Sequence, residues 1–139
     1  MSQSHNYEID LLVIQASPFC NIDCKYCYLP DRQLTKKISS ETIIKILENI
    51  ISDKLVNQHL SIVWHAGEPL SLNINYFEGL LKTVKQTADA NSLKVSHSIQ
   101  TNGMLINDEW CRIINEYDIS IGISIDGPSF LHDINRVIS

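Results

Sequence analysis

Strand-like and helix-like patterns alternate along almost the whole of this 139-residue chain. Strands are expected at 10–17, 61–65, 94–101 and 119–125, and three longer amphipathic segments lie between them. The first two strands are mainly apolar, as in strands that are buried on both faces. Strict alternation of this kind favours a parallel sheet with right-handed helical crossovers. The sequence therefore predicts an α/β fold.

Three helices are predicted from apolar residues at helical spacing. Ser40 can cap the first, and the second begins near Asn75 with Glu78 as its capping partner. The third follows Asn107, and a fourth fits near His132. The faces expected to be buried carry Ile43, Ile44, Leu47, Ile50 and Ile51 in the first helix, Phe77, Leu80, Leu81 and Val84 in the second, and Trp110, Ile113, Ile114 and Tyr117 in the third.

The last two strands carry a small polar face opposite an apolar one. Residues 95, 97 and 99 are Val, His and Ile, and they alternate with Ser96, Ser98 and Gln100; four isoleucines at 119–125 alternate with two serines and a glycine. A small polar face can line the interior of a ligand-binding barrel, whereas an open doubly wound sheet is apolar on both faces. The pattern favours a barrel. His97, on the apolar face, is predicted to be a hydrogen-bonded core histidine.

Unusual residues gather directly after each predicted strand. Three cysteines follow the first strand, 66–69 (Ala-Gly-Glu-Pro) the second, 101–103 (Thr-Asn-Gly) the third and 126–128 (Asp-Gly-Pro) the fourth. In (β/α) barrels this end of the strands carries the chemistry. Turn formation alone explains the third and fourth motifs equally well, but it does not explain the cysteines.

Composition and charge exclude several classes of function. With 44% hydrophobic residues, the chain can bury one core without disulfides. Its formal charge is −5 and no stretch collects basic residues, so no nucleic-acid partner is expected. The first apolar run, 11–14, is too short for a signal peptide or a membrane span, so we expect no membrane contact and a cytoplasmic location. Clustered cysteines in that reducing compartment are more often metal-binding or catalytic than disulfide-bonded.

Cys20, Cys24 and Cys27 form a CX3CX2C cluster that one loop could wrap around a single metal centre. Structural zinc sites and ordinary iron–sulfur clusters take four protein ligands, and no fourth ligand lies nearby. The remaining Cys111 falls inside the third predicted helix. Three ligands with one open position are typical of a catalytic metal centre.

Two further interpretations belong to other functional classes. Cys24 and Cys27 could form a dithiol redox pair or part of a zinc-binding module, although Pro30 disfavours the helix that usually follows such a pair, and Cys20 would have no role. The second interpretation is that the chain is a non-catalytic, truncated remnant of an enzyme, with exposed strand edges.

The cysteine spacing, with Tyr26 just before the third cysteine, resembles the radical SAM superfamily. The segment 65–70 (His-Ala-Gly-Glu-Pro-Leu) resembles its GGEP motif after the second strand. The segments 100–103, 124–128 and 132–133 resemble the SPASM-type branch, which includes anaerobic sulfatase-maturating enzymes and radical maturases of ribosomal peptides (RiPPs). The resemblance covers nearly the whole chain and implies an enzyme family.

The resemblance implies a [4Fe-4S] cluster held by Cys20, Cys24 and Cys27, with S-adenosylmethionine (SAM) on the open iron. Reductive cleavage of SAM would give a 5′-deoxyadenosyl radical that abstracts hydrogen from a peptide or protein substrate. The cofactors carry this chemistry, so no catalytic side chain is assigned. A reductant such as flavodoxin or ferredoxin is implied as a partner.

By matched position, the implied SAM-binding residues are Tyr26, Ala66, Gly67, Glu68, Gln100 and Ser124. Tyr26 would lie near the adenine, the backbone of 66–68 would receive the methionyl amino group, and Ser124 would contact its polar portion. Ala66 replaces the first glycine of GGEP, which costs roughly 1 kcal/mol if that position needs a positive φ. Glu68 fits either a carboxylate base or a structural hydrogen-bonding group.

The length of the chain indicates how much of such a barrel it can form. A full (β/α)8 barrel takes about 250 residues, and the family's partial (β/α)6 TIM-like barrel needs two more strand–helix units than this chain supplies. Residues 1–139 are therefore predicted to be the N-terminal portion of a radical SAM core domain, with four βα units. Strands five and six and the SPASM extension would be absent, as in part of a larger enzyme or a truncated gene product.

Overall fold

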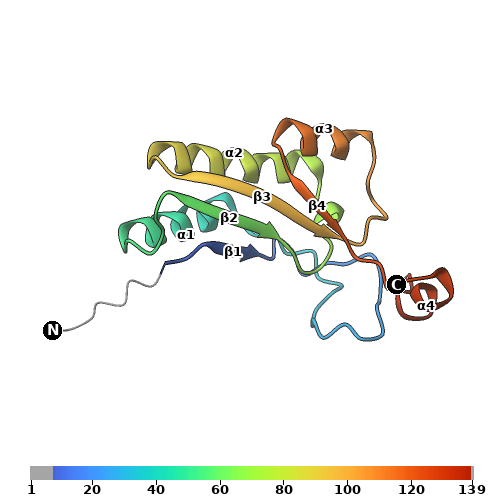
Figure 1. The fold of residues 1–139 in the computed structure, drawn as a ribbon. Helices are drawn as coiled ribbons and strands as arrows, with labels where there is room; N and C mark the ends of the chain where they lie inside the picture. Colours follow the sequence, from blue (N-terminus) through green and yellow to red (C-terminus); the bar gives the residue numbers. More distant parts are fainter. Residues whose placement is uncertain (1–7, 139) are drawn as a thin grey trace.

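A computed structural model describes residues 8–138 (Figure 1). Four parallel strands form one sheet in the order β1-β2-β3-β4: β1 (Leu11–Ile14), β2 (His59–Trp64), β3 (Lys94–Thr101) and β4 (Ser120–Ile123). Three helices cross between successive strands: α1 (Ser40–Ser52), α2 (Ile74–Ala90) and α3 (Asp108–Glu116). A 3-10 turn, η1 (Pro69–Ser71), follows β2, and α4 (Ser129–Asn135) follows β4. The predicted α/β alternation is confirmed.

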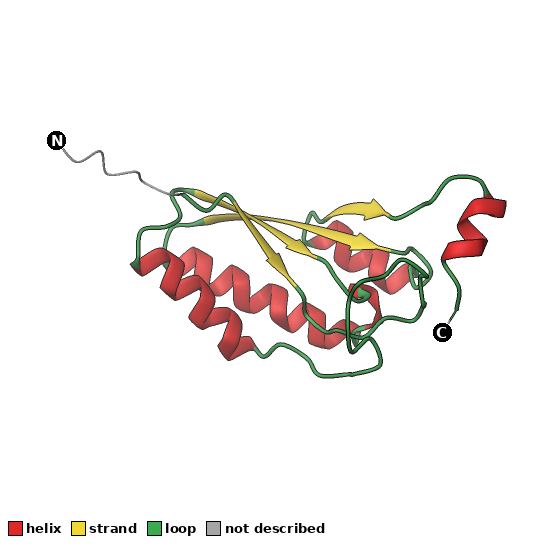
Figure 2. Ribbon diagram, turned by 90° about the horizontal axis from the view of Figure 1, so that it is seen from below, coloured by secondary structure: helices red, strands yellow, loops and turns green. Residues whose placement is uncertain are grey.

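Helices α1, α2 and α3 cover one face of the sheet and leave the other face open (Figure 2). In the register of β2 and β3, Ile62 pairs with His97 on the covered face, while Ser61 pairs with Ser96 on the open face. The small polar face predicted for the later strands is therefore the open face. Leu11 and Val13 of β1 also lie on this face and are 54% and 53% exposed. The prediction that the first strand is buried on both faces is wrong for this chain, because only one face has helices packed on it.

Aromatic residues form the centre of the core. The ring centroid of Phe77 on α2 lies 5.0 Å from that of Trp64 on β2, in an edge contact, and 5.3 Å from that of Trp110 on α3, in a tilted contact. Phe77 thus joins three elements. The predicted helix faces are buried here, fully at Ile43, Leu47, Ile50, Phe77, Leu80, Leu81, Val84, Trp110 and Ile113 and partly at Ile44, Ile51, Ile114 and Tyr117.

No helix within residues 8–138 is both long enough and apolar enough to cross a membrane.

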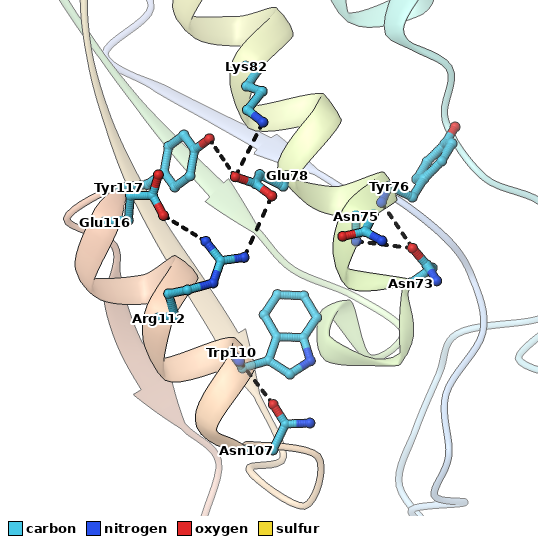
Figure 3. Close-up of polar contacts among 10 residues, drawn as sticks. All are labelled: Asn73, Asn75, Tyr76, Glu78, Lys82, Asn107, Trp110, Arg112, Glu116 and Tyr117. Carbon is cyan, nitrogen blue, oxygen red and sulfur yellow. Dashed lines mark hydrogen bonds and ion pairs between the residues drawn. The ribbon is translucent and has the colours of Figure 1, made fainter.

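Two of the three predicted helix starts are shifted. Ser39, not Ser40, caps α1 and accepts a hydrogen bond from the backbone N–H of Thr42 at 3.1 Å. Asn73 caps α2, ahead of the predicted start near Asn75 (Figure 3). Both shifts have one cause, because neighbouring serines or asparagines are equally good caps and local sequence does not choose between them. The cap of α3 by Asn107 is confirmed.

Glu78 does not cap α2 but joins that helix to α3 (Figure 3). It accepts a hydrogen bond from the Tyr117 hydroxyl at 3.1 Å, and it lies 3.4 Å from the Lys82 ammonium and 3.7 Å from the Arg112 guanidinium. Burial alone would raise the pKa of Glu78, but these three partners outweigh it and hold the pKa below its ordinary value. The carboxylate therefore stabilises the contact between α2 and α3.

His97 is a core histidine, as predicted. Its Nδ1 accepts a hydrogen bond from Trp64 Nε1 at 3.2 Å, and burial lowers its pKa from 6.5 to about 4. Between pH 6.5 and about pH 4, His97 is protonated in the unfolded chain but neutral in the folded chain. The free energy of unfolding is therefore highest above pH 6.5 and falls as the pH is lowered towards about 4. We expect this residue alone to reduce the unfolding free energy by about 2 kcal/mol between pH 7 and pH 5.

Urea unfolding of the wild type and of His97→Gln at the two pH values checks this expectation. The glutamine can still accept from Trp64 but does not titrate, so the variant should lose less stability on acidification by about the stated amount. An equal loss in both proteins would assign the pH dependence to other groups.

Candidate functional site

One cavity of about 190 Å³ opens at the carboxyl ends of the four strands. It is lined by every residue that the sequence nominated for the site: Cys20, Cys24, Cys27, Tyr26, Ala66, Gly67, Glu68, Gln100 and Ser124. Because the strands are parallel, the loops that follow them meet at the same edge of the sheet. The structure thus brings the nominated residues together around a shared space.

The cysteine loop is held by backbone and side-chain contacts at both ends. The backbone N–H of Cys20 donates to the carbonyl of Arg32 at 3.0 Å, and the Arg32 guanidinium pairs with the carboxylate of Asp23. Across the cavity edge, Asn102 Nδ2 donates to Asn21 Oδ1 at 2.8 Å. The loop after β1 is thereby fastened to the loop after β3.

The thiols of Cys20 and Cys24 are poor acids in this setting. Burial raises the pKa of Cys20, and it raises the pKa of Cys24 despite the opposing charge of Arg136. A bound metal reverses this preference, since a coordinating thiol is deprotonated. Cys20 and Cys24 therefore need positive charge in the cavity to become thiolates.

The donor set of three cysteine thiols around one cavity fits an iron–sulfur cluster. All four cysteines are free thiols, and Cys111 is exposed on α3 and does not line the cavity. Among the residues that the structure describes, no three His, Cys, Asp or Glu side chains converge closely enough to hold one metal ion. In a cluster each thiolate binds its own iron, so the sulfurs need only face a common cavity. A cluster with one open iron is the group that these residues could hold.

The loop after β2 has a left-handed backbone at two successive residues. Ala66 has a φ of 70° and Gly67 a φ of 62°, so the strain expected for alanine at this position is present. A Cβ on Gly67 would lie 2.5 Å from the carbonyl oxygen of Ser17 and 2.6 Å from that of Phe19. Glycine is required here because this loop passes directly against the backbone that precedes the cysteines.

Glu68 has a structural role, which was one of its two predicted roles. Its side chain is buried and accepts three hydrogen bonds, from the Thr101 hydroxyl at 2.5 Å, the backbone N–H of Asn102 at 2.9 Å and that of Leu70 at 3.2 Å. Its own backbone N–H donates to the carbonyl of Phe19 at 2.7 Å. One residue thus joins the loops after β1, β2 and β3 beneath the cavity.

Gln100 and Ser124 meet on the open side of the sheet. Gln100 Nε2 donates to Ser124 Oγ at 3.0 Å. The amide reaches Ser124 by crossing Gly122, where a Cβ would lie 2.3 Å from Gln100 Oε1. The small residue that the sequence pattern placed on this face of β4 therefore makes room for the side chain that orients Ser124.

Tyr26, Asp126 and Arg136 form a cluster beside Cys24, and the sequence analysis did not predict their contacts. The Tyr26 hydroxyl donates to Asp126 Oδ2 at 2.6 Å, and Arg136 places Nε 3.0 Å from Asp126 Oδ1 and Nη1 3.9 Å from Cys24 Sγ. The hydrogen bond raises the pKa of Tyr26 to about 12 and lowers that of Asp126. The sequence had singled out Tyr26 and the Asp126 motif separately, but it gave no signal for Arg136, because no spacing rule links Arg136 to Cys24.

Comparison with known proteins agrees with this geometry. The sequence model of the Radical SAM superfamily matches residues 14–139. An uncharacterized protein of Synechocystis is 38% identical over 130 residues, which are 91% of this chain and 33% of that protein. A cysteine-type anaerobic sulfatase-maturating enzyme of Clostridium perfringens is 32% identical over 92% of this chain and 35% of the enzyme.

Among solved structures, that of native anSMEcpe with bound AdoMet and the Kp18Cys peptide superposes with a TM-score of 0.77. It is 31% identical to this chain, and the match covers 91% of this chain and 34% of that one. The chain spans about a third of the length of the relatives it matches. With most of its residues matched by the family model, the chain belongs to the radical SAM superfamily.

Proposed function

We propose that residues 1–139 are the N-terminal portion of a radical SAM core domain and that the cavity at the strand ends binds a [4Fe-4S] cluster and SAM. The observation that carries this proposal is the shared cavity, in which Cys20, Cys24 and Cys27 face the β2 loop and Ser124. When bound, the two cofactors supply reductive cleavage of SAM to a 5′-deoxyadenosyl radical for hydrogen abstraction.

The chain's own residues bind and orient the cofactors. The three cysteines bind through thiolates, and because burial raises the pKa of Cys20 and Cys24, their protons leave as the metal enters. Ser124, fixed by Gln100, offers a hydroxyl to the polar part of SAM. Ala66 and Gly67 offer backbone groups in a turn that Glu68 holds in place from below.

The substrate is a peptide or protein, and the reaction is a post-translational modification. Support comes from a relative that is named an anaerobic sulfatase-maturating enzyme and from the related structure with a bound peptide. The electron comes from a one-electron donor such as flavodoxin or ferredoxin, because reductive cleavage consumes one electron. A cytoplasmic location suits the four free thiols.

The test is formation of 5′-deoxyadenosine. The full chain is reconstituted anaerobically with iron and sulfide, given SAM and dithionite, and the nucleoside is measured by mass spectrometry. We expect product from the wild type and a loss of at least about 100-fold in Cys24→Ala, because second-shell changes alone already cost metal sites 10–100-fold. Cys111→Ala is the matched control, since that thiol is exposed on α3 outside the cavity.

The result discriminates between the functional classes. Equal product from the wild type and Cys24→Ala would contradict the radical assignment. Stoichiometric zinc, or a titratable dithiol without SAM cleavage, would instead support the metal- or redox-binding module.

A further inference from the structure

The segment that follows β4 closes over the cysteine loop. In Figure 1, α4 lies beside the blue-to-cyan loop after β1 and apart from the helices that cover the sheet. The backbone N–H of Asp23 donates to the carbonyl of Val137 at 2.7 Å, and that of Lys25 donates to the carbonyl of Asn135 at 2.9 Å. With the antiparallel bridge between residues 22 and 138, these bonds make 135–138 a strand-like strap on the loop between the cysteines.

Side chains beneath the strap form a charged chain that ends at a cysteine. Tyr26 and Arg136 both contact Asp126, one on each carboxylate oxygen, and the Arg136 guanidinium also lies 5.6 Å from the centre of the Tyr26 ring. Arg136 Nε is buried and makes no well-aligned hydrogen bond within residues 8–138, although Asp126 Oδ1 is 3.0 Å away. Arg136 lines the cavity, and its Nη1 lies 3.9 Å from Cys24 Sγ.

The geometry points to Arg136 as a positioning residue that sets the reduction potential of the cluster through the sulfur of Cys24. This inference rests on the proposed function, since it requires the cluster. On reduction, one electron passes from an external one-electron donor to the cluster, no bond is made or broken, and the site gains one negative charge. A cation beside a ligating sulfur favours the more negative state, and hydrogen bonds to the sulfurs act in the same direction. Asp126 opposes the effect, because its carboxylate partly neutralises the guanidinium.

The charge effect can be separated from the strap itself. The strap is held to the loop by backbone hydrogen bonds, and Tyr26 reaches Asp126 without help from Arg136. An Arg136→Gln variant therefore keeps the backbone contacts and removes the charge. Arg136→Lys keeps the charge but loses the planar guanidinium.

The test is a redox titration of the anaerobically reconstituted chain, followed by the EPR signal of the reduced cluster, with iron content measured in parallel. At a fixed potential, we expect about a tenfold lower ratio of reduced to oxidised cluster in Arg136→Gln and a higher ratio in Asp126→Asn. The double variant should lie near the wild type, and Arg136→Lys between the wild type and Arg136→Gln. Arg112→Gln, a change of an exposed arginine on α3, is the control and should leave the ratio unchanged.

The outcomes separate the two proposals. A wild-type ratio in Arg136→Gln, with iron retained, would overturn the role of Arg136 and leave the cluster proposal standing. If Arg136→Gln loses its iron, Asp126→Asn decides, and an unchanged ratio there would overturn the role of the charge pair. A wild type that binds no cluster would contradict the proposed function and this inference with it.

Discussion

Replacing Gly67 with alanine is expected to destabilise the chain by at least about 2 kcal/mol and to abolish SAM binding. The residue has a φ of 62°, which costs an L-residue roughly 1–2 kcal/mol. The added Cβ would also lie 2.5 Å from the carbonyl oxygen of Ser17 and 2.6 Å from that of Phe19. Backbone atoms cannot move aside as flexible side chains do, so the loops after β1 and β2 would separate at the floor of the proposed SAM site.

The neighbouring residue, Ala66, provides a matched control in which the free energy of unfolding should change in the opposite direction. Ala66 has a φ of 70°, so Ala66→Gly removes left-handed strain while making the unfolded chain more flexible. The first effect is the larger, and we expect a gain of up to about 1 kcal/mol. Urea unfolding measures both variants, and equilibrium dialysis with labelled SAM measures binding. A Gly67→Ala variant with wild-type stability and SAM binding would show that the two loops are not packed as described.

Glu68→Gln is expected to lower the free energy of unfolding by about 3 kcal/mol. The carboxylate accepts from Thr101, Asn102 and Leu70, and an amide replaces one accepting oxygen with a donor. At least one buried N–H or O–H would then face another donor without a partner. The loss of the negative charge also weakens the remaining bonds, because hydrogen bonds to charged groups are the stronger ones.

Thr101→Val is the control for this prediction. It removes one of the three donors to Glu68 and the acceptor of the Gly103 backbone N–H, but it leaves the carboxylate with two donors and no donor facing another donor. Its cost should therefore be smaller, about 1–2 kcal/mol. Both variants are compared by urea unfolding. A Glu68→Gln variant of unchanged stability that cleaves no SAM would contradict the structural role and support the alternative of a carboxylate base.

Much of the fold can be predicted from short-range patterns of polar and apolar residues in the sequence. Ser96, Ser98 and Gln100 alternate with apolar residues, and this period of two alone places them on one face of a strand. Whether a face is covered depends on elements elsewhere in the chain, which is why the expectation for Leu11 and Val13 failed. Helix α1 begins at Ser40 and is capped by Ser39. Because the two adjacent serines are equally good caps, the local sequence could not show which of them would be the cap.

The candidate site was predictable where its residues follow strands. Cys20, Glu68 and Ser124 share a cavity because a parallel sheet brings its carboxyl ends together, and that arrangement follows from the order of elements. The contact between Cys24 and Arg136 spans more than a hundred residues and passes through Asp126. It depends on how α4 returns to the loop, and no periodicity or spacing in the chain encodes that path.

The most direct test of the central claim is the EPR spectrum of the reduced, anaerobically reconstituted chain with and without SAM, together with its iron and sulfide content. The account predicts about four irons and four sulfides per chain, a spectrum that changes when SAM is added, and loss of both in a variant with Cys20, Cys24 and Cys27 all replaced by alanine. Substoichiometric iron in the wild type, or a cluster whose spectrum is indifferent to SAM, would contradict it.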